Sequence, residues 1–150
     1  MHRTMFRLVA AVACAGFLNV AYGAGESKPV NAAAYKDAVK LACIGDSITC
    51  GPYPGMVKDA LGSKWDVTNF GVSGATMLRK GDKAFNKLGQ FAQALEKKPD
   101  VVTIALGTND SKPGNWNKKA EFEADYKAMI EELRKANPKV IIYCCLPPPA

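Results

Sequence analysis

Apolar residues recur along the chain in two alternating patterns, one typical of strands and one of helices. Four short apolar runs that end in glycine or proline are predicted strands: "VKLACIGDS" (39–47), "WDVTNFGVSG" (65–74), "DVVTIALG" (100–107) and "KVIIYCCLPPP" (139–149). Between them, apolar residues repeat at helical spacing in three sets: Tyr53, Met56, Val57, Ala60 and Leu61; Ala84, Phe85, Leu88, Phe91, Ala92 and Leu95; Phe122, Tyr126, Met129, Ile130 and Leu133. Gly62 and the pair Asn137-Pro138 are predicted helix stops.

This alternation predicts a single α/β domain, which suits a chain of 150 residues. Strands that alternate with helices form a parallel sheet, and right-handed crossovers place the helices on both of its faces. We therefore expect a flavodoxin-like, doubly wound parallel sheet whose helices turn their apolar stripes into the core. Ligands of such sheets bind at the carboxyl ends of the strands.

Residues 1–23 have the composition of a secretory signal peptide. A basic stretch, "MHRTMFR", precedes the apolar run "LVAAVACAGFLNVAYG", and the small residues Ala21 and Gly23 suit a cleavage site. The apolar run is short for a membrane span of about 20 residues; an uncleaved anchor, or a lipoprotein modified at Cys14, is a weaker alternative. We expect residues 1–23 to be a signal peptide, 24–37 a polar tether and 38–150 the folded domain. The protein is then exported, to a periplasm or out of the cell.

The charge does not indicate a nucleic-acid partner. The formal charge of +6 becomes 6 − 2 = +4 once Arg3 and Arg7 leave with the signal peptide. The remaining lysines are spread among acidic residues instead of forming a dense run. We interpret the charge as a solvated surface, and we expect no membrane insertion after signal cleavage.

Four cysteines remain after the signal peptide: Cys43, Cys50, Cys144 and Cys145. An even count in an exported chain invites disulfides. However, Cys43 lies in one strand-like run, and Cys144 and Cys145 are neighbours in another, where adjacent side chains point to opposite faces. We therefore expect buried free thiols. No metal site is expected, because the only histidine is His2 and no C-x-x-C spacing occurs.

Three motifs of small and polar residues follow the first three predicted strands: Gly45-Asp46-Ser47-Ile48-Thr49, Asn69-Phe70-Gly71-Val72-Ser73-Gly74 and Gly107-Thr108-Asn109-Asp110. Each motif alone is ordinary turn chemistry. Three together at one edge of a parallel sheet predict a functional site. A serine between a strand and a helix lies beside unsatisfied backbone N–H groups, and a glycine lets backbone approach a reacting carbonyl closely.

These motifs resemble a known family. In order and spacing, "IGDSIT", "NFGVSG" and "LGTND" are similar to blocks I, II and III of the SGNH (GDSL-type) hydrolases, and the resemblance runs from Val39 onward. The segments "NFGVSGATMLRKGDK" and "GTNDSKPGNW" resemble its sialate O-acetylesterase-like subgroup. The resemblance implies the SGNH hydrolase fold and a serine ester hydrolase without a cofactor. The implied substrate is a small-molecule or carbohydrate ester, foremost an O-acetyl group on a sugar.

The resemblance also implies roles for single residues. Ser47 would be the nucleophile, and Gly74, Asn109 and the Ser47 N–H would donate hydrogen bonds to the oxyanion. Residues expected to support the turns are Asp46, Gly71 and Asp110. Candidate walls of the substrate cleft, or alternatively anchors of their own loops, are Tyr53, Arg79 and Trp116.

The general base is missing from this pattern. The family takes it, with its orienting aspartate, from a late Asp-x-x-His block, and no histidine follows His2 here. The prolines after the fourth strand favour a fragment truncated after that strand over a complete protein that has lost catalysis. We expect little or no turnover from the 150-residue chain. Alternatives are a lipid or thioester acyl hydrolase of this fold, a non-catalytic carbohydrate-binding remnant, and a flavodoxin-like anion-binding domain.

Overall fold

Four parallel strands form a sheet in the order β2-β1-β3-β4. In the computed structural model, which describes residues 29–146, they are β1 (Val39–Gly45), β2 (Trp65–Gly71), β3 (Val101–Ala105) and β4 (Ile141–Cys144). Each strand lies within a predicted apolar run. The predicted signal peptide lies outside the described residues, so export stays a prediction. The described part of the tether holds a short 3-10 helix, η1 (Ala32–Ala34).

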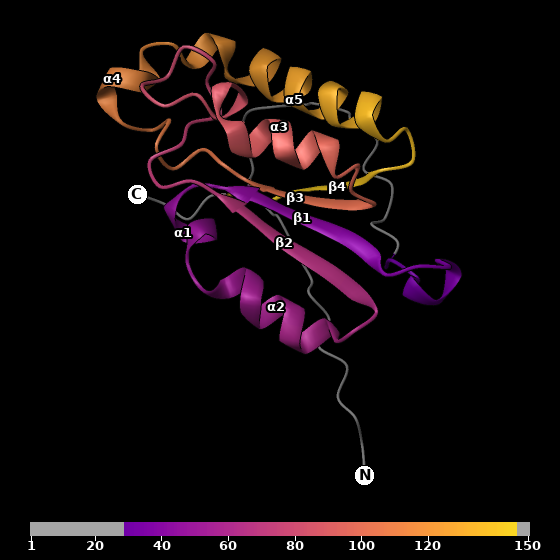
Figure 1. Ribbon diagram of the computed structural model, residues 1–150. Helices are drawn as coiled ribbons and strands as arrows, with labels where there is room; N and C mark the ends of the chain where they lie inside the picture. Colours follow the sequence, from indigo (N-terminus) through magenta and orange to yellow (C-terminus); the bar gives the residue numbers. More distant parts are fainter. Residues whose placement is uncertain (1–28, 147–150) are drawn as a thin grey trace. The chain divides into compact units, whose positions relative to one another are not determined.

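Helices cover both faces of the sheet (Figure 1). On one face lie α1 (Ser47–Cys50) and α2 (Tyr53–Leu61), and on the other lie α3 (Gly89–Glu96) and α5 (Phe122–Ala136). The connections contain the short elements η2 (Phe85–Lys87), α4 (Pro113–Trp116) and η3 (Lys119–Glu121). The predicted doubly wound α/β architecture is therefore confirmed.

The main core lies between the sheet and the pair α3 and α5. Ile44, Val102 and Ile104 supply the sheet side of this cluster, and each is fully buried. Met129 and Leu133 meet them from α5. Burying a side chain of this size stabilises the fold by about 1.5–3 kcal/mol relative to leaving it exposed. These contacts hold the central strands, whose ends carry the candidate site.

The predicted helical stripe from Ala84 to Leu95 is broken in the structure. Phe85–Lys87 form a 3-10 turn, Leu88 is extended (φ −89°, ψ 148°), and the α-helix begins only at Gly89. The break has a tertiary cause, because Ala84 pairs with Thr76 and the Phe85 N–H donates to the Thr76 carbonyl at 3.0 Å. Apolar spacing spans the break because side chains from both pieces enter one core.

The expectation that every helical stripe is buried is wrong for α2. Met56 is 67% exposed, and Leu61 is 40% exposed. The helix packs along β2, which is an edge strand, so much of its circumference has no sheet beneath it (Figure 1). Pro54 is the one residue of α2 that is buried.

The expectation of buried thiols holds for one of the four described cysteines. All four are free, and Cys43 is buried on the central strand β1. Cys50 and Cys144 are exposed, and Cys145 is half-buried. The difference follows from position: Cys50 ends the four-residue α1 and Cys144 ends the edge strand β4.

Candidate active site

The three predicted motifs emerge at one edge of the sheet. Gly45, the last residue of β1, pairs with Gly71 at the end of β2 and with Ala105 at the end of β3. The ends of β1, β2 and β3 are therefore level. Hydrogen bonds between the loops that follow them then determine where the candidate residues lie.

Ser47 is exposed and opens helix α1. The preceding residue, Asp46, caps this helix: its Oδ1 accepts a hydrogen bond from the Ile48 N–H at 3.0 Å, and its carbonyl accepts from the Cys50 N–H at 2.9 Å. Asp46 is itself 2% exposed. A side chain that caps the turn in this way holds the serine at a fixed place on the sheet edge.

Helix α1 packs directly on the end of β2, at Gly71. A Cβ at this glycine would lie 2.5 Å from the carbonyl carbon of Thr49 and closer still to the backbone N of Cys50. Any side chain would push the helix away from the strand. Gly71 thus supports the predicted site by permitting a close approach of two backbones.

Gly74 lies in the loop after β2 and has a positive φ of +79°. This left-handed conformation favours glycine over residues with a side chain. Within residues 29–146, the Gly74 N–H donates to no protein acceptor, and neither does the Ser47 N–H. Both N–H groups are therefore available to a ligand.

Asn109 joins the three motifs to one another. Its side chain is buried, and its Nδ2 donates to the Ala75 carbonyl at 3.1 Å and to Asp46 Oδ2 at 3.4 Å. Ala75 directly follows Gly74, and Asp46 directly precedes Ser47. The structure thus links the loops that carry all three predicted catalytic residues, and these contacts orient the Asn109 amide with its N–H groups toward the other two loops.

Asp110 joins its own loop to the loop after β2. Its carboxylate is completely buried, and it accepts from the Met77 N–H at 2.9 Å and from the Leu78 N–H at 2.7 Å. Burial raises the pKa of Asp110, while the two backbone hydrogen bonds oppose that rise. The supporting role expected for Asp110 therefore extends beyond its own turn.

Asn115 forms a second link between these loops, and it was not predicted from the sequence. Asn115, in α4, is 3% exposed. Its Nδ2 donates to the Asn109 carbonyl at 2.9 Å and to Asp82 Oδ1 at 3.0 Å, and its Oδ1 accepts from the Asp82 N–H at 3.0 Å. Nothing in the local sequence distinguishes Asn115 from the exposed Asn117 two residues later.

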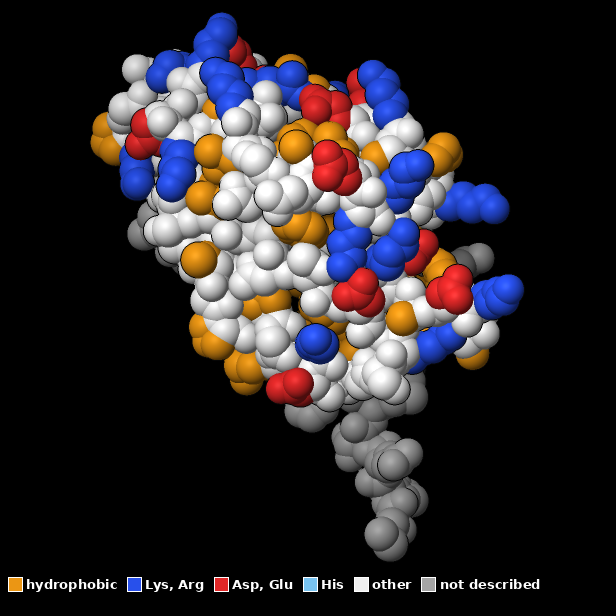
Figure 2. Space-filling view, viewed as in Figure 1, with side chains coloured by type: hydrophobic (Ala, Val, Ile, Leu, Met, Phe, Trp, Pro, Cys, Tyr) orange, Lys and Arg blue, Asp and Glu red, His pale blue; other side chains and the backbone are white. Residues whose placement is uncertain are grey.

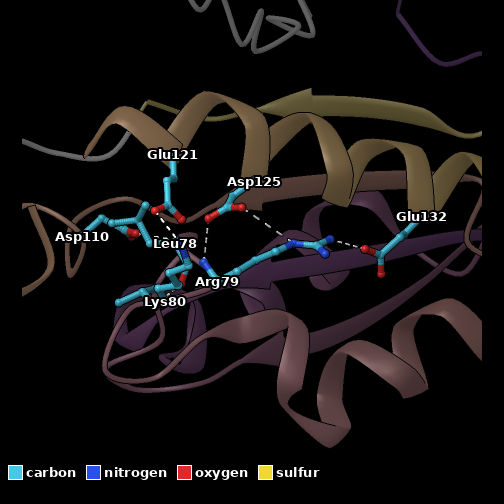
Figure 3. A network of polar contacts seen from close by, with 8 residues as sticks. Leu78, Arg79, Lys80, Asp110, Glu121, Asp125 and Glu132 are labelled. Carbon is cyan, nitrogen blue, oxygen red and sulfur yellow. Dashed lines mark hydrogen bonds and ion pairs between the residues drawn. The ribbon is translucent and has the colours of Figure 1, made fainter. Parts of the chain in front are cut away.

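Arg79, one of the three cleft candidates, is tied to helix α5 (Figure 3). Its guanidinium pairs with Glu132 and approaches Asp125 at 4.0 Å, and its backbone N–H donates to Asp125 Oδ2 at 2.8 Å. The next residue, Lys80, pairs with Glu121 at 2.8 Å. These contacts fasten the loop after β2 to α5 and to Glu121, which directly precedes this helix.

The other two cleft candidates differ in exposure. Tyr53 begins α2 and is half-buried, and this burial raises the pKa of its phenol. Trp116 ends α4 and is 43% exposed, and its ring makes an edge-to-face contact with Phe122 at a centroid distance of 6.2 Å. Whether these side chains contact substrate stays a prediction.

In the part of the chain that the structure describes, neither a metal site nor a membrane-spanning helix is found. No group of three or more His, Cys, Asp or Glu residues there could hold a metal ion. Among the same residues, no helix is long and apolar enough to cross a membrane.

Comparison with known proteins identifies the family of this arrangement. The sequence profile of the GDSL-like Lipase/Acylhydrolase family matches residues 43–150. The chain belongs to this family. The GDSL-like match covers all three motifs and the four strand ends, and it confirms the predicted SGNH (GDSL-type) resemblance.

Relatives within this comparison carry esterase names. An acetylxylan esterase of Xylanibacter ruminicola is 47% identical over an alignment 108 residues long, and the match covers 66% of this chain and 22% of that protein. The cellulase/esterase CelE of Acetivibrio thermocellus is 42% identical over 50 residues, or 33% of this chain and 6% of that protein. The chain thus spans about a fifth of the first relative. Neither name refers to sialate, so the sialate O-acetylesterase-like subgroup stays a prediction.

A solved structure shares the fold of this GDSL-like chain. The crystal structure of an acetyl xylan esterase, AlAXEase, matches with a TM-score of 0.56 and 26% sequence identity. The match covers 71% of this chain and 57% of that one. It agrees with the parallel sheet and flanking helices described above.

Proposed function

We propose that this chain carries the nucleophile and the oxyanion-binding groups of a serine esterase that removes acetyl groups from a carbohydrate. The observation that carries the proposal is the Asn109 amide, which joins the loop after β2 to the residue that precedes an exposed Ser47. The acetyl ester and the carbohydrate are suggested by the similar proteins, which are named acetylxylan esterases. No cofactor is required for this chemistry.

The reaction proceeds through an acyl-serine. Ser47 Oγ attacks the ester carbonyl carbon and loses its proton, and the carbonyl oxygen becomes an oxyanion. When the tetrahedral intermediate collapses, the bond to the sugar oxygen breaks, and that oxygen takes up a proton. Water then attacks the acetyl group on Ser47, releases acetate and restores the serine hydroxyl.

Three donors suit the oxyanion. Among the described residues, the Gly74 and Ser47 N–H groups have no protein acceptor, and Asn109 Nδ2 has one short and one long contact. The 3.4 Å contact to Asp46 is the weaker of the two, so its N–H is the one that would turn to the substrate oxygen. A single donor of this kind lowers the barrier by about 3–4 kcal/mol.

Turnover by the 150-residue chain should be slow. Residues 29–146 contain no histidine, so none of the described residues can offer an imidazole to take the Ser47 proton. Oxyanion donors alone retain about 10³–10⁴-fold acceleration over water when a triad is incomplete. The oxyanion donors can therefore accelerate the reaction even without a general base, but much less than both groups together.

The test is chemical rescue of the missing base. Hydrolysis of 4-nitrophenyl acetate is measured with and without added imidazole in the wild type, Ser47→Ala and Ser73→Ala. Ser73 is a matched control because it is also exposed and lies beside Gly74. Imidazole should accelerate the wild type and Ser73→Ala above the rate of Ser47→Ala, which reports the direct reaction of imidazole with the ester.

Two further measurements sharpen this test. Asn109→Ala should lower the rescued rate about 10²–10³-fold if its amide binds the oxyanion. A site that takes acetate should fail on the octanoate ester, which separates it from a lipid hydrolase. Equal rates in the wild type and Ser47→Ala under every condition would overturn the proposal.

A further inference from the structure

An exposed indole lies on the loop that carries the oxyanion asparagine. Trp116 is 43% exposed, and it is seven residues beyond Asn109. Its ring makes an edge-to-face contact with Phe122, at an interplanar angle of 67°, and Phe122 contacts Tyr126 at a centroid distance of 6.0 Å. The indole is therefore partly covered and partly open to solvent.

The backbone beneath this indole is anchored to the candidate active site. The preceding residue, Asn115, is buried and donates to the Asn109 carbonyl. The Trp116 N–H donates to the Lys112 carbonyl at 2.8 Å. The backbone of Trp116 thus has a fixed place relative to Asn109. Little conformational freedom of this segment is therefore lost when a ligand binds.

The surroundings of the indole are basic. Lys112, Lys118 and Lys119 lie within four residues of Trp116, and none of them forms an ion pair within residues 29–146. Of the nearby carboxylates, Asp82 is hydrogen-bonded to Asn115, Glu121 pairs with Lys80 and Glu123 pairs with Lys127. Figure 2 shows Lys and Arg side chains gathered at the end of the molecule where α4 lies in Figure 1.

We propose that Trp116 and its neighbouring lysines form a subsite for an acetylated polysaccharide that carries carboxylate groups. A sugar ring packs on the exposed part of the indole, and Lys112 and Lys119 pair with the carboxylates of uronic acid branches. The subsite lies beside the acetyl-binding site, so it holds the polymer while one of its esters is cleaved. This inference rests on the proposed function and specifies its substrate class.

Binding can be measured without turnover. The probes are xylo-oligosaccharides that carry a 4-O-methylglucuronic acid branch and unbranched xylo-oligosaccharides of equal length, neither of them acetylated. The chain has two tryptophans, so a Trp65→Phe background leaves Trp116 as the one indole that reports binding by fluorescence. Calorimetry gives the affinity of variants that lack this reporter.

The acidic probe should bind more tightly than the neutral probe and should change the Trp116 emission. Trp116→Ala should weaken binding about tenfold or more, as the loss of a central aromatic contact does. Trp116→Phe, which keeps a ring, should recover part of the affinity and guards against misfolding of the alanine variant.

The lysine contribution has a matched control. The double variant Lys112→Gln with Lys119→Gln should bind the acidic probe about threefold to tenfold more weakly, and this binding should lose most of its dependence on salt concentration. Lys135→Gln with Lys139→Gln should have no effect, because these exposed lysines lie near the opposite end of the strands, at the end of α5 and before β4.

The outcomes separate the two proposals. Equal binding by Trp116→Ala and the wild type, or equal and salt-independent binding of both probes, would overturn the subsite. Absence of binding together with Ser47-dependent hydrolysis would overturn the subsite and leave the esterase proposal intact. Trp116-dependent binding without Ser47-dependent hydrolysis would support the subsite and refute the esterase.

Discussion

Replacing Asp110 by asparagine tests the link between the two site loops. The substitution is nearly isosteric, so packing around this completely buried side chain stays the same. The carboxylate accepts from two backbone N–H groups, those of Met77 and Leu78, one on each oxygen. Asparagine has one acceptor oxygen, so one of these buried N–H groups would face an NH₂ group instead.

The magnitude follows from that single orphaned donor. A buried donor without an acceptor costs about 1–3 kcal/mol. Removing a buried charge offsets part of this loss, because burial disfavours the ionised Asp110, as its raised pKa records. We expect Asp110→Asn to lower the free energy of unfolding by about 1–2 kcal/mol at neutral pH, or roughly 4 °C in Tm per kcal/mol.

The pH dependence has a definite sign. Because the pKa of Asp110 is raised on folding, the native state binds more protons than the unfolded state between the unfolded and folded pKa values. The stability contributed by this group is therefore fully present below the unfolded pKa and is lost as the pH rises through the folded pKa. Asparagine does not titrate, so the advantage of the wild type over Asp110→Asn should shrink as the pH rises.

Urea unfolding followed by circular dichroism, at several pH values from mildly acidic to neutral, measures both quantities. Asp59→Asn, at an exposed position of α2, is the matched control and should change stability by less than about 0.5 kcal/mol. The reasoning fails if Asp110→Asn is as stable as the wild type. It also fails if the advantage of the wild type grows with pH, because the two hydrogen bonds would then outweigh burial.

Two further substitutions test the packing of the site. Gly71→Ala should destabilise the protein by about 1–3 kcal/mol in urea unfolding, because the added Cβ would overlap the backbone of α1. Gly55→Ala, where a Cβ meets nothing within 4 Å, should instead stabilise α2 by about 0.5–1 kcal/mol, and equal stabilities for the two variants would contradict the close approach. Asn115→Asp should lower Tm by an amount that corresponds to about 2–4 kcal/mol, since a carboxylate would face Asp82 and the Asn109 carbonyl. Its control is Asn117→Asp at an exposed position, and similar melting of both variants would show that Asn115 is not an anchor.

The strands were predictable because a strand that is buried on both faces has an almost continuous run of apolar residues. β1 and β3 are almost continuous apolar runs, and each lies between two neighbours in the sheet. The start of α3 was not predictable in this way. It depends on the pairing of Ala84 with Thr76, and both Phe85 and Phe91 are buried on either side of the break, so apolar spacing alone cannot detect it.

In the candidate site, the positions of the residues were predictable from the sequence, but their contacts were not. Ser47, Gly74 and Asn109 follow strand ends, and a parallel sheet brings such positions to one edge whatever the loops do. The contacts that orient them depend on tertiary structure. Asn115 meets Asp82 across 33 residues of chain, and Arg79 meets Glu132 across 53. Neither pair has a local pattern that distinguishes its members from other polar loop residues.

The loops after β2 and β3 behave as one interlocked unit. Asp110 and Asn115 belong to the second loop, but three of the backbone N–H groups that they hold, at Met77, Leu78 and Asp82, belong to the first. A loop graft from a homologue that exchanged one of them alone would remove the acceptors of these N–H groups, and those of Met77 and Leu78 would be left unpaired in the interior. Recombination of this scaffold should therefore exchange the two loops together, and transfer of the whole candidate site would also require the segment after β1 that carries Ser47.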